Sequence, residues 1–284
     1  NLFGTYVPPE LVDEMVKDPD SYSMKASTRE LTVMFCDMRG FTTMSETMEP
    51  TQLQALLNSV FSRLTDLIRS NRGTIDKYMG DCVMAFWGAP VDTPEHASLA
   101  VKTALEMVDA VRQLNKEHLV KGLPEIGIGI GLNTGSMCVG DMGSDIRRSY
   151  TVIGDAVNLG SRLEGLSKTY GVDTVVSEST RQLAPEFAWQ ELDKVRVKGK
   201  DQAVAIFSPV AVPGQPGTPA SSELREWALA LEAYRDQAWD DCDVHLLNLQ
   251  RMNAQKYLYR LYAERVTSMK LLPFDPEWDG ATNF

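Results

Sequence analysis

The sequence predicts a mixed α/β chain in which strands pair mostly antiparallel and helices cover one face of the sheet. Three observations predict this class. Segments with the period of a buried strand alternate with segments of helical period over residues 29–210. Two apolar segments, 74–78 and 82–87, are separated by three residues that include Gly80, the spacing of a tight hairpin. Residues 126–134 alternate isoleucine with glycine, which is typical of a strand with glycine on one face.

The individual elements follow from these periods. Helical segments carry leucine, alanine or valine every three or four residues, and strand segments are short and apolar. In chain order, besides the hairpin, the pattern predicts a strand over 29–37, a helix over 50–70, a helix over 94–118, strands over 126–134 and 150–153, a helix over 155–170, and strands over 173–177, 187–198 and 203–208. No helix opens directly after the isoleucine–glycine strand, which argues against a dinucleotide-binding loop.

Composition shifts divide the chain into four parts. Residues 1–24 resemble a short connector, and residues 25–210 form the α/β body. Residues 211–222 are dense in proline, glycine and serine, which indicates a linker. Residues 223–284 form a helical extension, in which the apolar stripes predict two helices packed as a hairpin, followed by an extended acidic end.

The charge balance excludes one class of partner. The chain has 284 residues, with 28 lysines and arginines against 39 acidic residues, a net charge of −11. Such a chain is not suited to grip a nucleic acid polymer or an anionic membrane surface by neutralising phosphates. Its four cysteines form no CxxC pair, which favours a reducing compartment. The chain begins with Asn1 in place of Met, so we expect a piece of something longer.

Two aspartates lie where apolar strands end. Asp37 closes the strand 29–37, and Asp81 lies in the hairpin turn. Such carboxylates need a partner because an unpaired buried charge is costly. Two carboxylates that converge on Mg²⁺ would suit phosphoryl chemistry, in which metal ions hold the attacking and leaving oxygens. The alternative is a pair of turn aspartates that accept backbone N–H groups, and spacing alone favours it.

Several other polar residues have both a functional and a purely structural interpretation. Gly40, Phe41 and Thr42 form a turn that opens a helix, where free backbone N–H groups could bind an anion. The alternative is an ordinary strand-to-helix turn. Lys77 lies within a largely apolar strand, either exposed or bound to a ligand. Lys198, at a turn between strands, is by itself a solubilising lysine.

Asn158 and Arg162 lie four residues apart on one face of the helix 155–170. An amide beside a guanidinium suits the charge that develops on a phosphate in a transition state. A solvated helix face is the alternative for any such pair taken alone.

The order of these motifs resembles that of class III nucleotidyl cyclases. VMFCDMRGFT at 33–42 resembles their first metal motif, and KYMGDCVMAFWG at 77–88 resembles their second. YTVIGDAVNLGSRLE at 150–164 resembles their nucleotide-binding and transition-state motif, and VKGK at 197–200 their late lysine. The resemblance covers about residues 25–210, and four motifs in order make it specific.

The resemblance implies a ferredoxin-like β-α-β-β-α-β core with added strands, and conversion of a nucleoside triphosphate to a 3′,5′-cyclic monophosphate and pyrophosphate. It implies that Asp37 and Asp81 hold two divalent cations, Mg²⁺ or Mn²⁺, of which one activates the ribose 3′-OH and the other binds the triphosphate. Asn158 would orient the ribose, and Arg162 would stabilise the α-phosphoryl group as the ring closes. Lys198 would contact the phosphates.

One of the arginines just before the third motif, Arg147 or Arg148, could add a phosphate contact, and the sequence does not decide between them.

Substrate choice rests on Lys77 and Thr151 under this resemblance. Adenylyl cyclases of the family place a lysine at adenine N1 and an aspartate or threonine at the exocyclic amine, and this pair resembles the bacterial subtype with threonine. Guanylyl cyclases usually have glutamate at the lysine position. Because lysine donates and cannot accept, Lys77 suits N1 of adenine and not the protonated N1 of guanine. A threonine hydroxyl can also donate, so Thr151 discriminates less sharply than an aspartate would.

The family places the metal aspartates of one subunit opposite the purine and transition-state residues of the other. This chain has both sets, which implies a head-to-tail homodimer with composite sites and an inactive monomer. The resemblance also implies upstream sensor or membrane segments, and hence a cytoplasmic domain of a larger membrane-anchored protein. Nothing in the sequence selects among bicarbonate, calcium, pH or another regulatory input.

The leading interpretation is therefore an adenylyl cyclase that acts on ATP. The alternatives are a guanylyl or dual-specificity cyclase, and a non-catalytic nucleotide-binding signalling module. A diguanylate cyclase is disfavoured because the hairpin has Met79-Gly80-Asp81 in place of the acidic Gly-Gly signature.

Overall fold

The computed structural model describes residues 12, 16–17, 25–143, 148–196, 202–210 and 221–284. The chain folds into two compact units. The first comprises residues 1–167 and 173–186, and the second comprises residues 168–172 and 187–284. Most of the predicted connector and most of the predicted linker lie outside the described residues.

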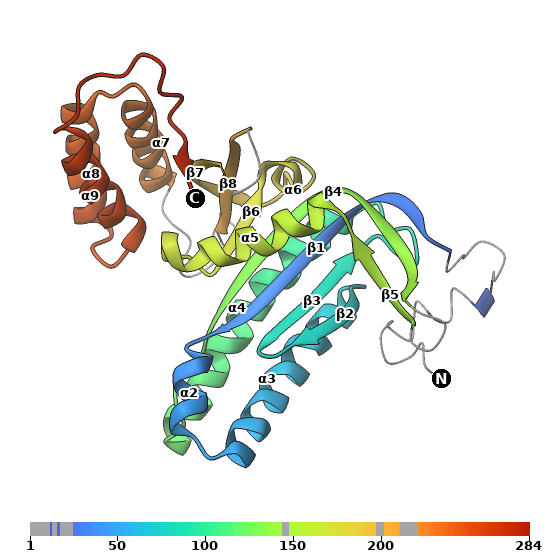
Figure 1. The fold of residues 1–284 in the computed structure, drawn as a ribbon. Coiled ribbons are helices and arrows are strands. Elements are labelled where there is room, and N and C mark those ends of the chain that lie inside the picture. Colours follow the sequence, from blue (N-terminus) through green and yellow to red (C-terminus); the bar gives the residue numbers. More distant parts are fainter. Residues whose placement is uncertain (1–11, 13–15, 18–24, 144–147, 197–201, 211–220) are drawn as a thin grey trace. The chain divides into compact units, whose positions relative to one another are not determined.

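Four antiparallel strands form the centre of the first unit (Figure 1). β1 (Ser27–Arg39) pairs with β3 (Cys82–Trp87) on one side and with β4 (Gly127–Gly143) on the other. β2 (Thr74–Met79) completes the hairpin with β3. The order β2-β3-β1-β4, with one helix before β2 and another before β4, is the ferredoxin-like β-α-β-β-α-β arrangement. The predicted fold class is confirmed.

The two long helices of this core lie on the same face of the sheet (Figure 1). They are α3 (Pro50–Ser70) and α4 (His96–Lys121), and both match their predicted segments. α4 is tied to the sheet at its start, where His96 Nδ1 and Thr32 Oγ1 lie 2.7 Å apart. The predicted turn at Gly40 does open a helix, the short α2 (Phe41–Thr47).

The prediction that all helices of the body share one face is wrong for α5 (Asp155–Tyr170). This helix packs on the side of β1 from which Val33 and Phe35 project, as their contacts with Gly160 show. Its backbone comes so close to β4 that a Cβ added to Gly131 would lie 2.3 Å from the Glu164 nitrogen. The glycines on one face of the isoleucine–glycine strand therefore leave room for the close approach of this helix.

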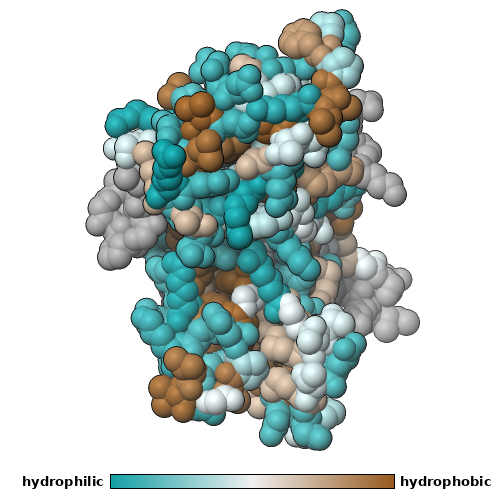
Figure 2. Space-filling model, turned by 90° about the vertical axis from the view of Figure 1, so that its left-hand side faces the viewer, coloured by the Kyte–Doolittle hydropathy of each residue, from teal (hydrophilic) through white to brown (hydrophobic). Residues whose placement is uncertain are grey.

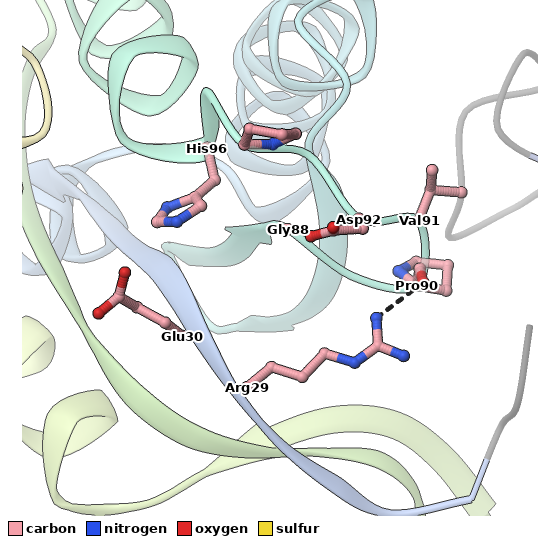
Figure 3. Close-up of a pocket in the computed structure, with 8 residues that line it drawn as sticks. Arg29, Glu30, Gly88, Pro90, Val91, Asp92 and His96 are labelled. Carbon is pink, nitrogen blue, oxygen red and sulfur yellow. Dashed lines mark hydrogen bonds between the residues drawn. The ribbon is translucent and has the colours of Figure 1, made fainter.

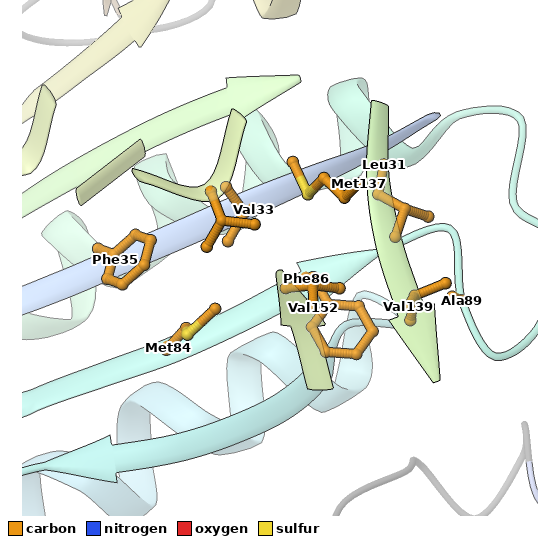
Figure 4. Packing of buried hydrophobic residues seen from close by; sticks show 10 residues of the cluster. Leu31, Val33, Phe35, Met84, Phe86, Ala89, Met137, Val139 and Val152 are labelled. Atoms are coloured by element: carbon orange, nitrogen blue, oxygen red, sulfur yellow. The ribbon is translucent and has the colours of Figure 1, made fainter. Parts of the chain in front are cut away.

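A hydrophobic cluster fills the same side of the sheet (Figure 4). β5 (Arg148–Ile153) pairs with the outer half of β4 and contributes Val152 to this cluster. The ten buried members come from β1, β3, β4, β5, α5 and the segment after β3, and they are Leu31, Val33, Phe35, Met84, Phe86, Ala89, Met137, Val139, Val152 and Val157. The cluster holds β5 in a fixed position against the core.

The first unit ends with a parallel strand and a short helix. β6 (Thr174–Ser177) pairs in parallel with β4, and α6 (Glu178–Gln182) follows directly. Ser177 caps this helix because its side chain accepts a hydrogen bond from the Thr180 N–H.

The second unit combines three strands with three helices. β7 (Ala188–Arg196) and β8 (Val204–Val210) form an antiparallel hairpin, and β9 (Thr282–Asn283) pairs in parallel with β7. The predicted extended acidic end thus contains a short strand, β9.

The helices of this unit correct the predicted two-helix hairpin. They are α7 (Ser221–Arg235), α8 (Trp239–Met252) and α9 (Tyr257–Met269). α7 begins inside the predicted linker, and α8 was not predicted. The buried face of α8 is narrow and consists of Cys242, Leu246 and Leu249. Acidic residues lie between these positions, so the helical period of apolar residues is hard to detect in the sequence.

Aromatic side chains form the core of the second unit. The buried Trp227 ring lies 5.3 Å from the Tyr259 ring and 4.9 Å from the Tyr262 ring, measured between centroids. Figure 2 shows a face on which hydrophilic side chains predominate and hydrophobic ones form separate patches. None of the described helices combines the length and the apolar composition that crossing a bilayer requires.

Candidate active site

The two predicted metal-binding aspartates lie side by side in the first unit. Asp37 on β1 pairs across the sheet with Cys82, the residue after Asp81. The Met38 N–H donates to the Asp81 carbonyl oxygen at 3.2 Å, which fixes the hairpin turn against β1. Gly80, with a φ of +65°, makes that turn possible because its left-handed backbone favours glycine.

The surroundings of Asp37 suit a cation better than a structural role. Burial and the neighbouring Asp81 carboxyl group raise the pKa of Asp37 to about 6. Among the described residues, no group donates a hydrogen bond to the buried Asp37 Oδ1. Two adjacent carboxylates with an unpartnered buried oxygen form an arrangement that a divalent cation would satisfy. The residues present therefore fit the implied metal.

A third carboxylate, Glu164, lies close to this pair and was assigned no role from the sequence. Burial and the Asp37 charge raise the pKa of Glu164 to about 7, while the Arg39 charge acts in the opposite direction. Its Oε1 atom lies 2.7 Å from where a Cβ on Gly129 would stand, and Gly129 pairs with Asp37. Two sequence signals could have indicated that Glu164 lies near Asp37: the glycine spacing of β4 and the position of Glu164 in the third motif.

Protein groups alone do not complete a metal site here. In the described part of the chain, no three His, Cys, Asp or Glu side chains form a group that could hold a metal ion. Mg²⁺ is commonly bound by one or two carboxylates together with substrate phosphates and water. The Asp37–Asp81 pair matches that mode of binding.

The predicted anion-binding turn lies directly after β1. Gly40 has a φ of +74° and occupies the N-cap position of α2. Thr42 is exposed and Phe41 is half-buried, and a Cβ added to Gly40 would meet no atom within 4 Å. The turn is thus open on the side of Gly40.

Lys77 and Thr151 meet at a residue that was assigned no role, Asp76. The Thr151 hydroxyl lies 2.6 Å from Asp76 Oδ2, and the Lys77 ammonium lies 3.4 Å from Asp76 Oδ1. β2 supplies the lysine and β5 the threonine. The two residues predicted to recognise the purine are therefore brought to one carboxylate by different strands.

Asn158 and Arg162 lie on one face of α5, as predicted. Asn158 is exposed and Arg162 is half-buried. Their side chains make no hydrogen bond or ion pair with any residue that the structure describes.

Within the described residues, no hydrogen bond or ion pair joins the Asp37–Asp81 pair to Lys77 or Thr151, or either set to Arg162. Lys198, Arg147 and the side chain of Arg148 lie outside the described residues.

A groove of about 780 Å³ lies at the other end of β1 (Figure 3). Arg29 and Glu30 line it from β1, and the Arg29 guanidinium donates to the Pro90 carbonyl oxygen at 3.1 Å. Eight residues of strand separate Arg29 from Asp37, about 26 Å. None of the predicted site residues that the structure describes lines this groove.

The chain is similar to proteins of known activity over most of its length. Residues 24–208 match the family described as "Adenylate and Guanylate cyclase catalytic domain". The chain is 43% identical to an adenylate cyclase of Anabaena cylindrica over 187 residues, which is 64% of this chain and 37% of that protein. The chain spans about a third of the length of the curated relatives that it matches.

Two solved structures resemble the fold. The adenylyl cyclase CyaB from P. aeruginosa superposes with a TM-score of 0.62 at 32% identity, over 69% of this chain and 100% of that chain. The guanylyl cyclase Cya2 superposes with a TM-score of 0.60 at 32% identity, over 68% of this chain and 98% of that chain.

Proposed function

The chain belongs to the adenylate and guanylate cyclase catalytic domain family, and on that premise we propose that it converts ATP to 3′,5′-cyclic AMP and pyrophosphate. The observation that carries the proposal is the Asp37–Asp81 pair, with its unpartnered buried oxygen, inside the matched residues. We assign the catalytic domain to residues 25–210, preceded by the connector 1–24 and followed by the linker and the helical extension. Because α7 begins at Ser221, the boundary between linker and extension, predicted at 222/223, moves to 220/221.

Asp37 and Asp81 would hold two divalent cations, Mg²⁺ or Mn²⁺. When bound, those cations supply Lewis-acid activation of the ribose 3′-OH and charge neutralisation for the triphosphate. The turn Gly40–Thr42 offers backbone N–H groups, and Lys198 a cation, to the phosphates.

Asn158 and Arg162 act on the reacting groups. Asn158 orients the ribose so that its 3′ oxygen faces the α-phosphorus. As that oxygen bonds to the α-phosphorus, the bond from phosphorus to the bridging oxygen breaks, pyrophosphate leaves, and the hydroxyl proton passes to solvent. Arg162 stabilises the charge on the α-phosphoryl group during this exchange, because a guanidinium binds phosphoryl oxygens in a fixed geometry.

The active form is a head-to-tail homodimer. Two observations support this assembly. No described hydrogen bond or ion pair joins the Asp37–Asp81 pair to Lys77, Thr151 or Arg162, and the side chains of Asn158 and Arg162 form no hydrogen bond or ion pair with a described residue. In a C₂ dimer each site takes the aspartates from one protomer and Lys77, Thr151, Asn158 and Arg162 from the other. The rate per protomer should then rise with protein concentration, and a rate independent of concentration would contradict the dimer.

The choice of ATP rests on Lys77 and Thr151. Lys77 donates to N1 of adenine, and Thr151 accepts from the exocyclic amine. The second candidate is a guanylyl or dual-specificity cyclase, which the equal identity to adenylyl and guanylyl cyclase structures keeps open.

The test is incubation of the purified chain with ATP and Mn²⁺. We expect cyclic AMP from the natural sequence and none from Asp37→Ala. Wild-type activity in that variant would contradict the metal assignment, and a kcat/KM preference for GTP in direct competition would favour the second candidate. Tight ATP binding without turnover at high protein concentration would instead indicate a non-catalytic signalling module.

We place this domain on the cytoplasmic side of a larger membrane-anchored protein with sensor segments upstream. The short span of the chain relative to its curated relatives supports a larger protein. Fractionation of cells that express the full-length protein tests this placement, and recovery only in the soluble fraction would contradict it.

A further inference from the structure

Asp76 is a buried acidic residue with an unusual position in β2. Its side chain is 0% exposed, whereas the next side chain, Lys77, is 45% exposed. The register between β2 and β3 shifts at this point, so that Ile75 pairs with Ala85 and Lys77 with Met84. The bulge turns Asp76 inward and leaves Lys77 at the surface.

One carboxylate oxygen of Asp76 determines how Thr151 can hydrogen-bond. Asp76 Oδ2 lies 2.6 Å from the Thr151 hydroxyl and 3.3 Å from the Val152 backbone nitrogen. Val152 is held in the hydrophobic cluster, so its N–H has a fixed direction (Figure 4). A backbone N–H only donates, and therefore Oδ2 is an acceptor and Thr151 donates its single proton to it.

The other carboxylate oxygen faces the lysine. Asp76 Oδ1 lies 3.4 Å from the Lys77 ammonium and accepts no hydrogen bond from the described residues. Burial raises the pKa of Asp76 above its ordinary value, whereas the Thr151 hydroxyl, the Lys77 ammonium and the Val152 N–H act in the opposite direction. The same group thus restrains the ammonium of Lys77 while it takes the proton of Thr151.

We propose that Asp76 is the positioning residue that makes this site selective for adenine. A threonine hydroxyl has one proton and two acceptor positions. Once the proton is committed to Asp76, the oxygen can only accept, as the 6-amino group of adenine requires. It has no proton for O6 of guanine. This inference rests on the proposed cyclase function, and it removes the ambiguity that a threonine otherwise carries.

The test compares ATP and GTP as substrates of the full chain. We expect Asp76→Ala to lower the ratio of kcat/KM for ATP to kcat/KM for GTP by about tenfold, the effect of one hydrogen bond. Thr151→Val, which has no hydroxyl, should lower the ratio by a similar factor. The double variant should have the ratio of Thr151→Val alone, because Asp76 acts on selectivity through that hydroxyl.

Two further variants separate positioning from a structural role. Asp76→Asn keeps an oxygen that can accept from Thr151 and Val152, so the ratio should stay near that of the wild type. Thr74→Val removes a different buried hydrogen bond of β2, from Thr74 to the Ala89 carbonyl oxygen at 2.8 Å, and should not change the ratio. If Asp76→Ala does not fold, Asp76→Val makes the same test with a residue suited to a strand.

The outcomes distinguish the two proposals. If the wild type cyclises ATP and Asp76→Ala lowers both kcat/KM values equally, Asp76 only ties β2 to β5 and the inference fails while the function stands. If the wild type cyclises neither nucleotide, the proposed function fails, and the ratio of dissociation constants for non-hydrolysable ATP and GTP analogues tests Asp76 instead. An unchanged binding ratio in Asp76→Ala then overturns it.

Discussion

Two carboxylates, one in each unit, differ in what surrounds them. Asp193 on β7 is 1% exposed and has a full set of donors. Its Oδ2 accepts from the Tyr170 hydroxyl at 2.6 Å, the Arg265 guanidinium at 2.6 Å and the Thr282 hydroxyl at 2.8 Å, and its Oδ1 accepts from the Lys194 N–H. Asp37 faces another carboxylate and keeps a buried oxygen without a described donor.

The difference separates two uses of a carboxylate. At Asp193, donors satisfy both carboxylate oxygens, and these hydrogen bonds stabilise the packing of strands and helices. An arrangement that leaves an oxygen unsatisfied, as at Asp37, costs stability and provides a place for a cation. Asp76 combines the two, because one oxygen is satisfied and the other faces only a lysine.

Replacement of Asp37 should have the largest effect of all, and that effect is on activity. We expect Asp37→Asn to lower cyclic AMP formation at least about a thousandfold, since Lewis-acid stabilisation is worth several kcal/mol and each 1.36 kcal/mol is tenfold in rate. The initial rate with ATP and Mn²⁺ measures it. Asp92→Asn, an exposed aspartate at the groove of Figure 3, is the matched control and should keep full activity.

Replacement of Asp193 should have the converse effect, on stability. Asp193→Ala leaves the largely buried Arg265 guanidinium without its partner, and we expect the free energy of unfolding of the second unit to fall by about 3–5 kcal/mol. Urea denaturation followed by tryptophan fluorescence measures it, since Trp227 lies in this unit. Asp240→Ala, in an exposed pair with Lys270, should leave the unfolding midpoint unchanged. A small loss in Asp193→Ala would contradict the comparison.

Metal should stabilise one unit and not the other. Binding to the folded state alone adds about 2.7 kcal/mol at a metal concentration one hundred times the dissociation constant. Mn²⁺ should therefore raise the melting temperature of the first unit in the wild type, and less or not at all in Asp37→Asn. An equal shift in both proteins would place the metal elsewhere.

The smallest expected effect is a pH dependence of stability without metal. Folding raises the pKa of Asp37 from its ordinary 3.8 to about 6, so the folded state binds the proton more tightly. The contribution of Asp37 to stability is therefore greatest below pH 4 and is lost as the pH rises through 6. In EDTA, Asp37→Asn should be more stable than the wild type at pH 7.5, by less than about 1 kcal/mol because the carboxyl group is partly exposed.

This sign is the opposite of that for a carboxylate in an ion pair. Urea denaturation of both proteins at pH 4.5 and pH 7.5 measures the difference. If the wild type is more stable than Asp37→Asn at pH 7.5, the Asp37 carboxylate has partners that satisfy its charge, and the prediction is wrong.

The sequence predicted those features that depend on local periods and on motif order. The helices over 50–70 and 155–170 match α3 and α5, because each has a wide apolar stripe. The strand of alternating isoleucine and glycine is β4, although it runs further, to Gly143. α8 escaped prediction because its apolar stripe is narrow and lies among acidic residues.

The remainder depends on which elements meet in space. Glu164 approaches Asp37 only because Gly129 and Gly131 let α5 come close to β4. In the sequence, Asp76 is a single polar residue in a strand. No spacing along the chain indicates that β5 brings Thr151 within hydrogen-bond distance of it. Contacts of this kind join residues far apart in the chain, so periodicity cannot reveal them.

In the proposed dimer, one catalytic site takes Asp37 from one protomer and Arg162 from its partner. The most direct measurement mixes two inactive variants, Asp37→Asn and Arg162→Ala, under conditions in which the dimers exchange. A mixed dimer has one site with both lesions and one intact site, so an equal mixture should recover about a quarter of the wild-type rate of cyclic AMP formation. If the mixture stays as inactive as its components while subunit exchange is demonstrated, each protomer contains its own complete site and the account is wrong.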